Sequence, residues 1–299
     1  MISGQVPKHL VQGARAGFLQ ALKDTPQQWR TIANEFPMSA KAVDLVDLGA
    51  APMPVESGAG LTIQDFIEKT LQVKPKDWDI TVYYSHNAMM DDQTGGTLER
   101  RVRGAGMNFN KHMDKLIFQA LNAGDAATYG LCYDGQYYFD TDHVDKGGQY
   151  QTNQSNKSAV SLTLDNFEAA WVAATNFLDD QGEIAGNVPN LLIVPPAYKR
   201  EAAQIADNRE AYDVANRAIN PWSGEVRYIV SPYLDSTSWF LVAGNEAVKP
   251  LMLVMREQPN LQSAWFDPAK PDGGHYYFKF FARYYVAYSD WRVAYQGNT

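Results

Sequence analysis

Cysteine is almost missing from this 299-residue chain, whose only thiol is that of Cys132. One thiol cannot form a disulfide within the chain, and it cannot provide the several ligands of a cysteine-rich zinc site. The remaining composition, with 45% hydrophobic and 20% charged residues, is ordinary for a soluble globular protein. A chain of this length holds one large domain or two modest ones.

A basic excess is missing as well. Lys and Arg number 26 against 34 Asp and Glu, which gives a net charge of −8. A dedicated nucleic-acid binder needs a basic surface to neutralise phosphates, so that class is excluded, although the chain can lie beside DNA without adhering to it. No run of 18 apolar residues occurs, and the N-terminus lacks the apolar core of a signal peptide. We therefore expect a protein that does not span a membrane and is made, and used or assembled, in a cytoplasm-like compartment.

Recognisable catalytic motifs are also absent. There is no G-x-S-x-G nucleophile motif, and the basic segment Arg100–Gly106 lacks the G-x-x-x-x-G-K-[ST] pattern of a phosphate-binding loop. We interpret this segment as a solvated helix face that pairs with acidic groups of a neighbouring subunit. Four histidines are scattered along the chain without a serine or cysteine nucleophile motif nearby: His9, His86, His112 and His275.

The adjacent carboxylates Asp91 and Asp92 are candidates for acid–base chemistry. Adjacent side chains in a strand point to opposite faces, however, which separates the two groups. Negative charge close to the start of a helix is favourable in any case. We interpret this pair as structural.

A stronger candidate is the segment "LCYDGQYYFDTDHVDKGG", residues 131–148, in which Asp140, Asp142 and His143 have the chemistry of ligands for zinc, manganese or iron. No H-x-x-x-H pattern or second His–carboxylate pair completes such a site. The alternative is a hairpin, because Asp134–Gly135 is flanked by aromatic strand residues. The next residues then form a turn through hydrogen bonds to their own backbone. We favour the hairpin, and expect no catalytic, cofactor-binding or metal-binding residues.

Apolar residues at helical spacing predict several helices. One pattern covers the first 40 residues, continuing after Pro26, and another predicts a helix over 164–178. The strongest runs from Leu98 to Ala123, about 40 Å long, with Gly124 placed as a C-cap. Glycines within it are expected to weaken or bend it. Its apolar positions step by three or four residues: Leu98, Val102, Ala105, Phe109, Met113, Leu116 and Ala120.

Strands are predicted in other parts of the chain. Alternation over 78–84 predicts the second strand of a long excursion, with charged residues near its tip: Glu68, Lys69, Lys74 and Lys76. Further strands are predicted around 190–196, 225–234, 238–244 and 250–255, with a helix ending near Ile205, whereas the polar residues 145–158 predict an exposed loop. The C-terminal strand has a wholly apolar face: Phe278, Phe280, Ala282, Tyr284, Val286 and Tyr288. Helices and strands do not alternate regularly as βαβ, so the expected class is α+β.

Four segments, in order along the chain, carry a resemblance to a known family. They are "YDGQYYFDTDH" at 133–143, "NLLIVPPAYKREA" at 190–202, "NPWSGEVRYIVSPYLD" at 220–235 and "WRVAYQG" at 291–297. With these, the chain resembles the Mu-like phage major head subunit family, whose members resemble major capsid proteins of the Hong Kong 97 type.

The resemblance implies a domain organisation. Residues 1–50 correspond to the N-terminal arm, 51–88 to the E-loop that lies over the next subunit, and 89–162 to the peripheral domain with its long spine helix. Residues 163–268 correspond to the axial domain, and 269–299 to C-terminal strands that return to the peripheral domain. In some proteins of this fold a lysine crosslinks neighbouring subunits, and Lys69, Lys74 and Lys76 lie where an E-loop lysine would.

The resemblance also implies a function without catalysis or cofactors. The expected protein is a major capsid protein of a tailed bacteriophage that self-assembles, as hexamers and pentamers, into an icosahedral shell around double-stranded DNA contacted non-specifically. Portal, scaffold, maturation protease and decoration proteins are possible partners, and the expected location is the virion, assembled in the host cytoplasm. Two alternatives stay open: an encapsulin-like nanocompartment shell, and a metal-dependent hydrolase using Asp140, Asp142 and His143.

Overall fold

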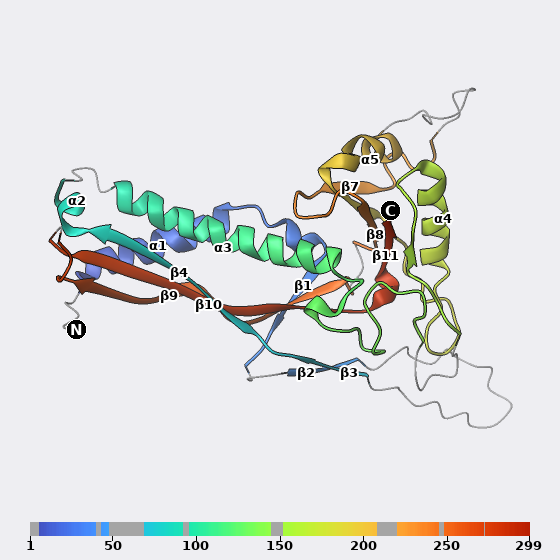
Figure 1. Cartoon of the computed structure of the whole chain (residues 1–299), viewed down its shortest axis with the longest axis horizontal. Coiled ribbons are helices and arrows are strands. Elements are labelled where there is room, and N and C mark those ends of the chain that lie inside the picture. The colour runs from blue at the N-terminus through green and yellow to red at the C-terminus, as the bar shows by residue number, and fades with distance from the viewer. Residues whose placement is uncertain are drawn as a thin grey trace, which may run out of the picture.

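A computed structural model describes residues 6–39, 43–47, 69–91, 96–144, 152–207, 220–244, 248–271 and 273–299. Helices and strands form an elongated α+β body with a four-stranded sheet along its length and a five-stranded sheet at one end (Figure 1). A separate two-stranded ribbon lies beside the body. Within the described residues, no helix is long and apolar enough to cross a membrane.

The four-stranded sheet has the order β1-β9-β10-β4, and we call it the long sheet. Its strands are β1 (Ala33–Pro37), β4 (Lys76–Ser85), β9 (Leu251–Asp267) and β10 (His275–Tyr288). β1 runs parallel to β9, and the other neighbours are antiparallel. The apolar face predicted for the C-terminal strand is confirmed, because all six of its side chains are at most 2% exposed: Phe278, Phe280, Ala282, Tyr284, Val286 and Tyr288.

Two helices, α1 (Lys8–Asp24) and α3 (Gly96–Asn122), run along the long sheet (Figure 1). The predicted apolar stripe of α3 is confirmed, since every position named for it is buried. Phe18 of α1 joins the two helices to the sheet: its ring stacks on Phe280 at 4.2 Å and meets Phe109 edge-on at 5.7 Å. The helices touch at Gly106, where a Cβ atom would lie 2.8 Å from the carbonyl oxygen of Phe18.

The helix predicted through the whole of the first 40 residues is wrong after Pro26. A short 3₁₀ turn, η1 (Gln28–Thr31), is followed by β1, which pairs in register with β9 from Ala33↔Leu251 onward. Trp29 and Ile32 are buried as a helical pattern would require, whereas Phe36 is 39% exposed. Backbone pairing with β9 therefore decided the structure of this segment over its local apolar spacing.

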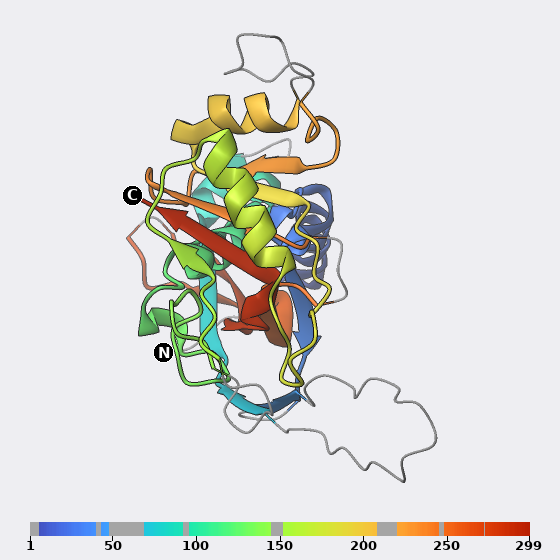
Figure 2. The same ribbon diagram turned by 90° about the vertical axis from the view of Figure 1, so that its right-hand side faces the viewer.

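The five-stranded sheet has the order β5-β11-β8-β6-β7. Its strands are β5 (Lys157–Ser158), β6 (Leu191–Val194), β7 (Arg227–Val230), β8 (Ser238–Val242) and β11 (Ala294–Asn298). Every residue of β6 and β8 is buried, as expected for strands covered on both faces. The predicted helices are present as α4 (Leu164–Thr175), which packs near β11, and α5 (Lys199–Ala206), which packs near β6 and β7 (Figure 2).

The sheets do not coincide with the domain boundaries expected from the sequence. β9 lies in the long sheet although it falls within 163–268, the expected axial domain. Conversely, β11 lies in the five-stranded sheet although it belongs to the C-terminal strands expected to return to the peripheral domain. The short 3₁₀ turn η4 (Trp291–Val293) connects the two sheets between β10 and β11.

The ribbon pairs β2 (Val43–Asp47) antiparallel with β3 (Lys69–Val73), from Val43↔Val73 to Asp47↔Lys69. The prediction that Lys74 and Lys76 lie near the tip of this excursion is wrong. Lys76 begins β4 and is paired with Tyr284, because the apolar alternation of β4 fits the edge of the long sheet. Lys69 begins β3, and Glu68 lies outside the described residues together with 48–67.

Candidate assembly surfaces and a buried polar cluster

The structure does not assemble the three candidate metal ligands into one site. His143 is fully buried, whereas Asp142 is exposed and its pKa is raised by the hydrogen bond and the negative charge of Asp140. In the parts of the chain that the structure describes, no three histidine, cysteine or acidic side chains converge as metal ligands would. Asp142 and His143 thus lie in different environments, one exposed and one buried.

The reversal at Asp134–Gly135 is a tight turn rather than the predicted hairpin between strands. Cys132 N–H donates to the carbonyl oxygen of Gln136 at 2.8 Å, and Gly135 has a φ of 84°, which favours glycine. Among the described residues, the residues that flank this turn have no strand partners. Aromatic packing takes the place of a ladder, since Tyr138 stacks on Tyr288 at 4.7 Å.

A buried polar cluster surrounds His143. Its Nδ1 atom lies 2.6 Å from Asp134 Oδ2, and its Nε2 atom lies 3.2 Å from Asn156 Oδ1. The Asn156 amide nitrogen donates to the carbonyl oxygens of Tyr138 and Trp291, so its oxygen is the atom that faces the imidazole. Both ring nitrogens thus face oxygen atoms, Nδ1 that of Asp134 and Nε2 that of Asn156.

The same cluster connects the first and last of the four family segments. The Trp291 ring stacks on His143 with 4.3 Å between centroids and 7° between planes. Arg292 is 5% exposed and donates to Tyr133 Oη at 2.8 Å and to Asp290 Oδ1 at 3.2 Å. The two middle segments also meet, because β6 pairs in parallel with β7. All four segments therefore converge around the five-stranded sheet.

Asn156 is the member of this cluster that the sequence does not reveal. It belongs to the polar stretch 145–158 expected as an exposed loop, yet it is fully buried, and the next two residues form β5 beside β11. That part of the prediction is wrong, while residues 145–151 lie outside the described residues. An asparagine within a polar run carries no local sign that it contacts a histidine 13 positions away.

The other candidate side chains lie apart from this cluster. Asp91 is exposed at the end of α2 (His86–Asp91), and Asp92 lies outside the described residues. His9 is exposed on α1. Each remaining histidine contacts its own aromatic neighbours: His86 with Tyr276, His112 with Trp78, and His275 with Tyr83 and Tyr277.

The basic segment of α3 has partners within the chain. Arg103 pairs with Glu99 at 3.3 Å one helical turn away, and Arg101 donates to the carbonyl oxygen of Tyr83 at 2.7 Å. The predicted solvated helix face is present, because Arg100, Arg101 and Arg103 are all exposed. Pairing with a neighbouring subunit remains a prediction.

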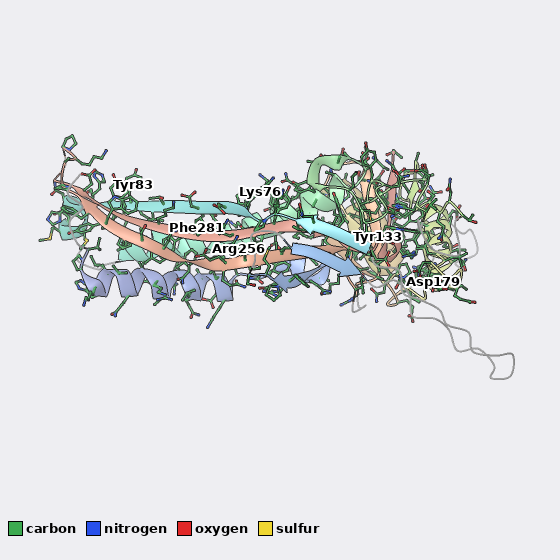
Figure 3. All side chains as sticks on the ribbon, turned by 90° about the horizontal axis from the view of Figure 1, so that it is seen from below. Lys76, Tyr83, Tyr133, Asp179, Arg256 and Phe281 are labelled. Carbon is green, nitrogen blue, oxygen red and sulfur yellow. The ribbon has the colours of Figure 1, made fainter. Side chains whose placement is uncertain are left out.

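One face of the long sheet remains partly open. Figure 3 looks onto it, with Lys76 and Tyr83 at opposite ends of β4 and Phe281 between them along the sheet. Ion pairs cross from β4 to β10, with 2.6 Å between Asp77 and Arg283. The Tyr83 ring is 56% exposed at the far end. This face offers aromatic and charged groups for contact.

A cavity of about 250 Å³ opens at the other end of β4. We call it the cationic cavity, and its lining includes Lys76, Trp78, His112, Lys115, Tyr129 and Tyr285. These residues come from β4, α3, the short turn η2 (Ala127–Tyr129) and β10. Burial and the charge of Lys115 lower the pKa of His112.

Comparison with known proteins places this chain among phage head proteins. The family model of the Mu-like prophage major head subunit gpT matches residues 8–161 and 148–234. Over 181 residues the chain is 29% identical to the Mu-like prophage FluMu major head subunit of Haemophilus influenzae, a match that covers 60% of this chain and 56% of that protein. It is 22% identical to the major capsid protein of Escherichia phage Mu, with 76% of this chain and 97% of that protein covered.

The fold leads to the same group of proteins. The subunit in the procapsid of bacteriophage JBD30 superposes with a TM-score of 0.59 at 19% identity, covering 98% of this chain and 76% of that chain. The expected class is therefore confirmed, and the fold is that of phage capsid proteins of the Hong Kong 97 type. Since the family match extends over residues 8–234, the chain belongs to the family of Mu-like prophage major head subunits, the major capsid proteins of Mu-like tailed phages.

Proposed function

We propose that many copies of this chain, arranged as hexamers and pentamers, form the closed icosahedral shell of a phage head around double-stranded DNA. The family match over residues 8–234 is the observation that carries this proposal. Closed symmetry turns a modest contact between two subunits into a stable shell, because each contact is repeated around every subunit. The long sheet, supported by helices α1 and α3, suits a shell subunit that must keep its shape.

The ribbon of β2 and β3 supports a role in contacts between subunits. These two strands pair only with each other among the described strands, and an isolated two-stranded ribbon is marginally stable in water. We assign residues 51–88 in part to an E-loop that lies over a neighbouring subunit, with β4 contributing to the long sheet. We assign residues 1–50 to an N-terminal arm, the long sheet with α3 to the peripheral domain, and the five-stranded sheet to the axial domain.

The charge of the chain fits a container for DNA. A net charge of −8 limits adsorption of the packaged polymer to the inner wall, so contact with DNA is non-specific. The site of action is the virion, with assembly in the host cytoplasm. Portal, scaffold, maturation protease and decoration proteins are the proposed partners, and the shell role requires no catalysis or cofactor.

An encapsulin-like shell is the second candidate because it would use the same type of fold. The match to a phage head family favours the phage head over it. Expression of the chain followed by negative-stain microscopy tests shell formation. Analysis of the contents of particles isolated from their natural source then separates the two candidates, since a head encloses DNA and a nanocompartment encloses protein. The burial of His143 against Asp134 and Asn156, apart from the exposed Asp142, is the observation that argues against the hydrolase alternative.

A further inference from the structure

Two lysines, Lys76 and Lys115, line the cationic cavity. Lys76 Nζ lies 3.0 Å from Tyr285 Oη and 4.2 Å from the centroid of the same ring, so this aromatic side chain fixes its position. Lys115 reaches the cavity from α3. Neither lysine has an ion-pair partner among the residues that the structure describes. Two cations without a carboxylate attract an anion to this cavity.

The size and walls of the cavity limit what that anion can be. At about 250 Å³, the cavity is smaller than the roughly 300–1,000 Å³ of sites that hold drug-sized ligands. It has room for one amino-acid side chain. Trp78, Tyr129 and Tyr285 supply aromatic walls against which methylene groups can pack. A short carboxylate side chain matches both the aromatic walls and the lysines. Its apolar stem would lie against the rings and its charge beside the ammonium groups.

We propose that the cationic cavity receives an aspartate or glutamate side chain from a second copy of this chain. This proposal rests on the proposed function, because assembly into a shell holds copies against one another at high local concentration. The cavity lies where β4 begins, with two residues between that point and the end of the ribbon strand β3. It is therefore next to the element proposed to contact neighbours. The 34 acidic residues of the chain supply the carboxylates.

The pKa of His112, which lines the cavity, should respond to a carboxylate bound there. Its ring packs on Trp78 with 4.3 Å between centroids, and its Nδ1 atom lies 2.8 Å from Tyr284 Oη. In the free subunit its pKa is lowered by burial and by Lys115. A carboxylate in the cavity would oppose both effects, since an adjacent negative charge favours the protonated imidazole.

Zero-length crosslinking tests the proposal on the wild-type protein. Shells are assembled from an equal mixture of ¹⁵N-labelled and unlabelled subunits, treated with a carbodiimide that joins amines to carboxylates in direct contact, and digested for mass spectrometry. The proposal predicts crosslinks from Lys76 or Lys115 to an acidic residue in peptides that combine both isotopes. Crosslinks confined to single-isotope peptides, or intersubunit crosslinks at other lysines only, would overturn it.

Paired variants test whether the contact matters for assembly. K76Q/K115Q is expected to raise the subunit concentration needed for assembly at least tenfold. The control K111Q removes an exposed lysine of the same helix that does not line the cavity, and should leave that concentration unchanged. If the wild-type chain forms shells and K76Q/K115Q assembles at the same subunit concentration, this inference is refuted and the proposed function is not. Failure of the wild-type chain to form any shell would instead refute the proposed function.

Discussion

The imidazole of His143 and the carboxylate of Asp134 form a pair that solvent does not reach, with 2.6 Å between Nδ1 and Oδ2 and side-chain exposures of 0% and 1%. Asp134 also accepts the backbone N–H of Gln136 at 3.0 Å, so one carboxylate both closes the turn and holds the histidine. The indole ring of Trp291, near the C-terminus, stacks on the imidazole ring of His143. The contact between His143 and Trp291 therefore joins the first family segment to the last.

Substitution of Asp134 by alanine is expected to lower the free energy of unfolding by about 1–3 kcal/mol, because it leaves the buried Nδ1 atom of His143 without its hydrogen-bond partner. Equilibrium urea unfolding of unassembled subunits, followed by tryptophan fluorescence, measures the change. D142A is the matched control: this carboxylate is exposed in the same segment, and its removal should change stability by less than about 0.5 kcal/mol. Equal effects of the two variants would show that the cluster does not stabilise the fold.

Two glycines of α3 should respond in opposite ways to alanine. A Cβ atom at Gly106 would lie 2.8 Å from the Phe18 carbonyl oxygen and 2.9 Å from Ala21 Cβ, so G106A should destabilise the subunit by about 1–3 kcal/mol. At Gly104 no atom lies within 4 Å of such a Cβ. G104A should therefore stabilise the subunit by about 0.5–1 kcal/mol, through the higher helix propensity of alanine. Thermal unfolding distinguishes the two, and a stabilising G106A would contradict the close contact between α1 and α3.

The stability of the subunit should depend on the protonation of His112. Because burial and Lys115 lower the pKa of His112 in the folded state below the ordinary histidine value of 6.5, the unfolded chain binds the proton more readily. The contribution of neutral His112 to the free energy of unfolding is thus fully present above pH 6.5. It is lost as the pH falls through the lower, folded-state pKa. Between pH 7.5 and 5, wild-type subunits should lose more thermal stability than H112Q, which cannot gain this proton. Parallel curves for the two proteins would contradict the assignment.

Removal of the ribbon should separate folding from assembly. Residues 44 and 72 are directly paired, so replacement of residues 45–71 by Asn-Gly leaves a two-residue hairpin that closes without strain. Leu71 packs against a small cluster that includes Val254 and Ala287 of the long sheet. No strand of that sheet pairs with the deleted residues, and the variant should remain soluble and cooperatively folded. Sedimentation and microscopy are expected to show subunits without shells. Normal shells from this variant would refute the role proposed for the ribbon.

Strong periodic patterns were sufficient to predict the main elements of the fold. The stripe of α3 and the apolar face of β10 were both predicted, because many residues repeat one period over a long segment. The structure of the segment after Pro26 was not predicted correctly. Ala33–Pro37 becomes a strand only by pairing with Leu251–Met255, over 200 residues away. Local propensity carries no record of such a partner.

The functional surfaces could be predicted only in part. The Asp-Gly turn was visible in the sequence, but the buried contact of His143 with Asn156 depends on how the chain returns after residue 151. The cationic cavity could not be predicted, because Lys76, Lys115 and Tyr285 come from three elements that only the fold brings together. The family was recognisable from four short segments, which the structure places around one sheet.

Cryo-electron microscopy of the expressed full chain tests the central claim most directly. The account predicts closed shells with icosahedral symmetry, built from hexamers and pentamers in which each subunit has the long sheet, the two bracing helices and the five-stranded sheet described above. Monomers or small oligomers alone, over a wide range of protein concentration, salt and pH, would contradict it.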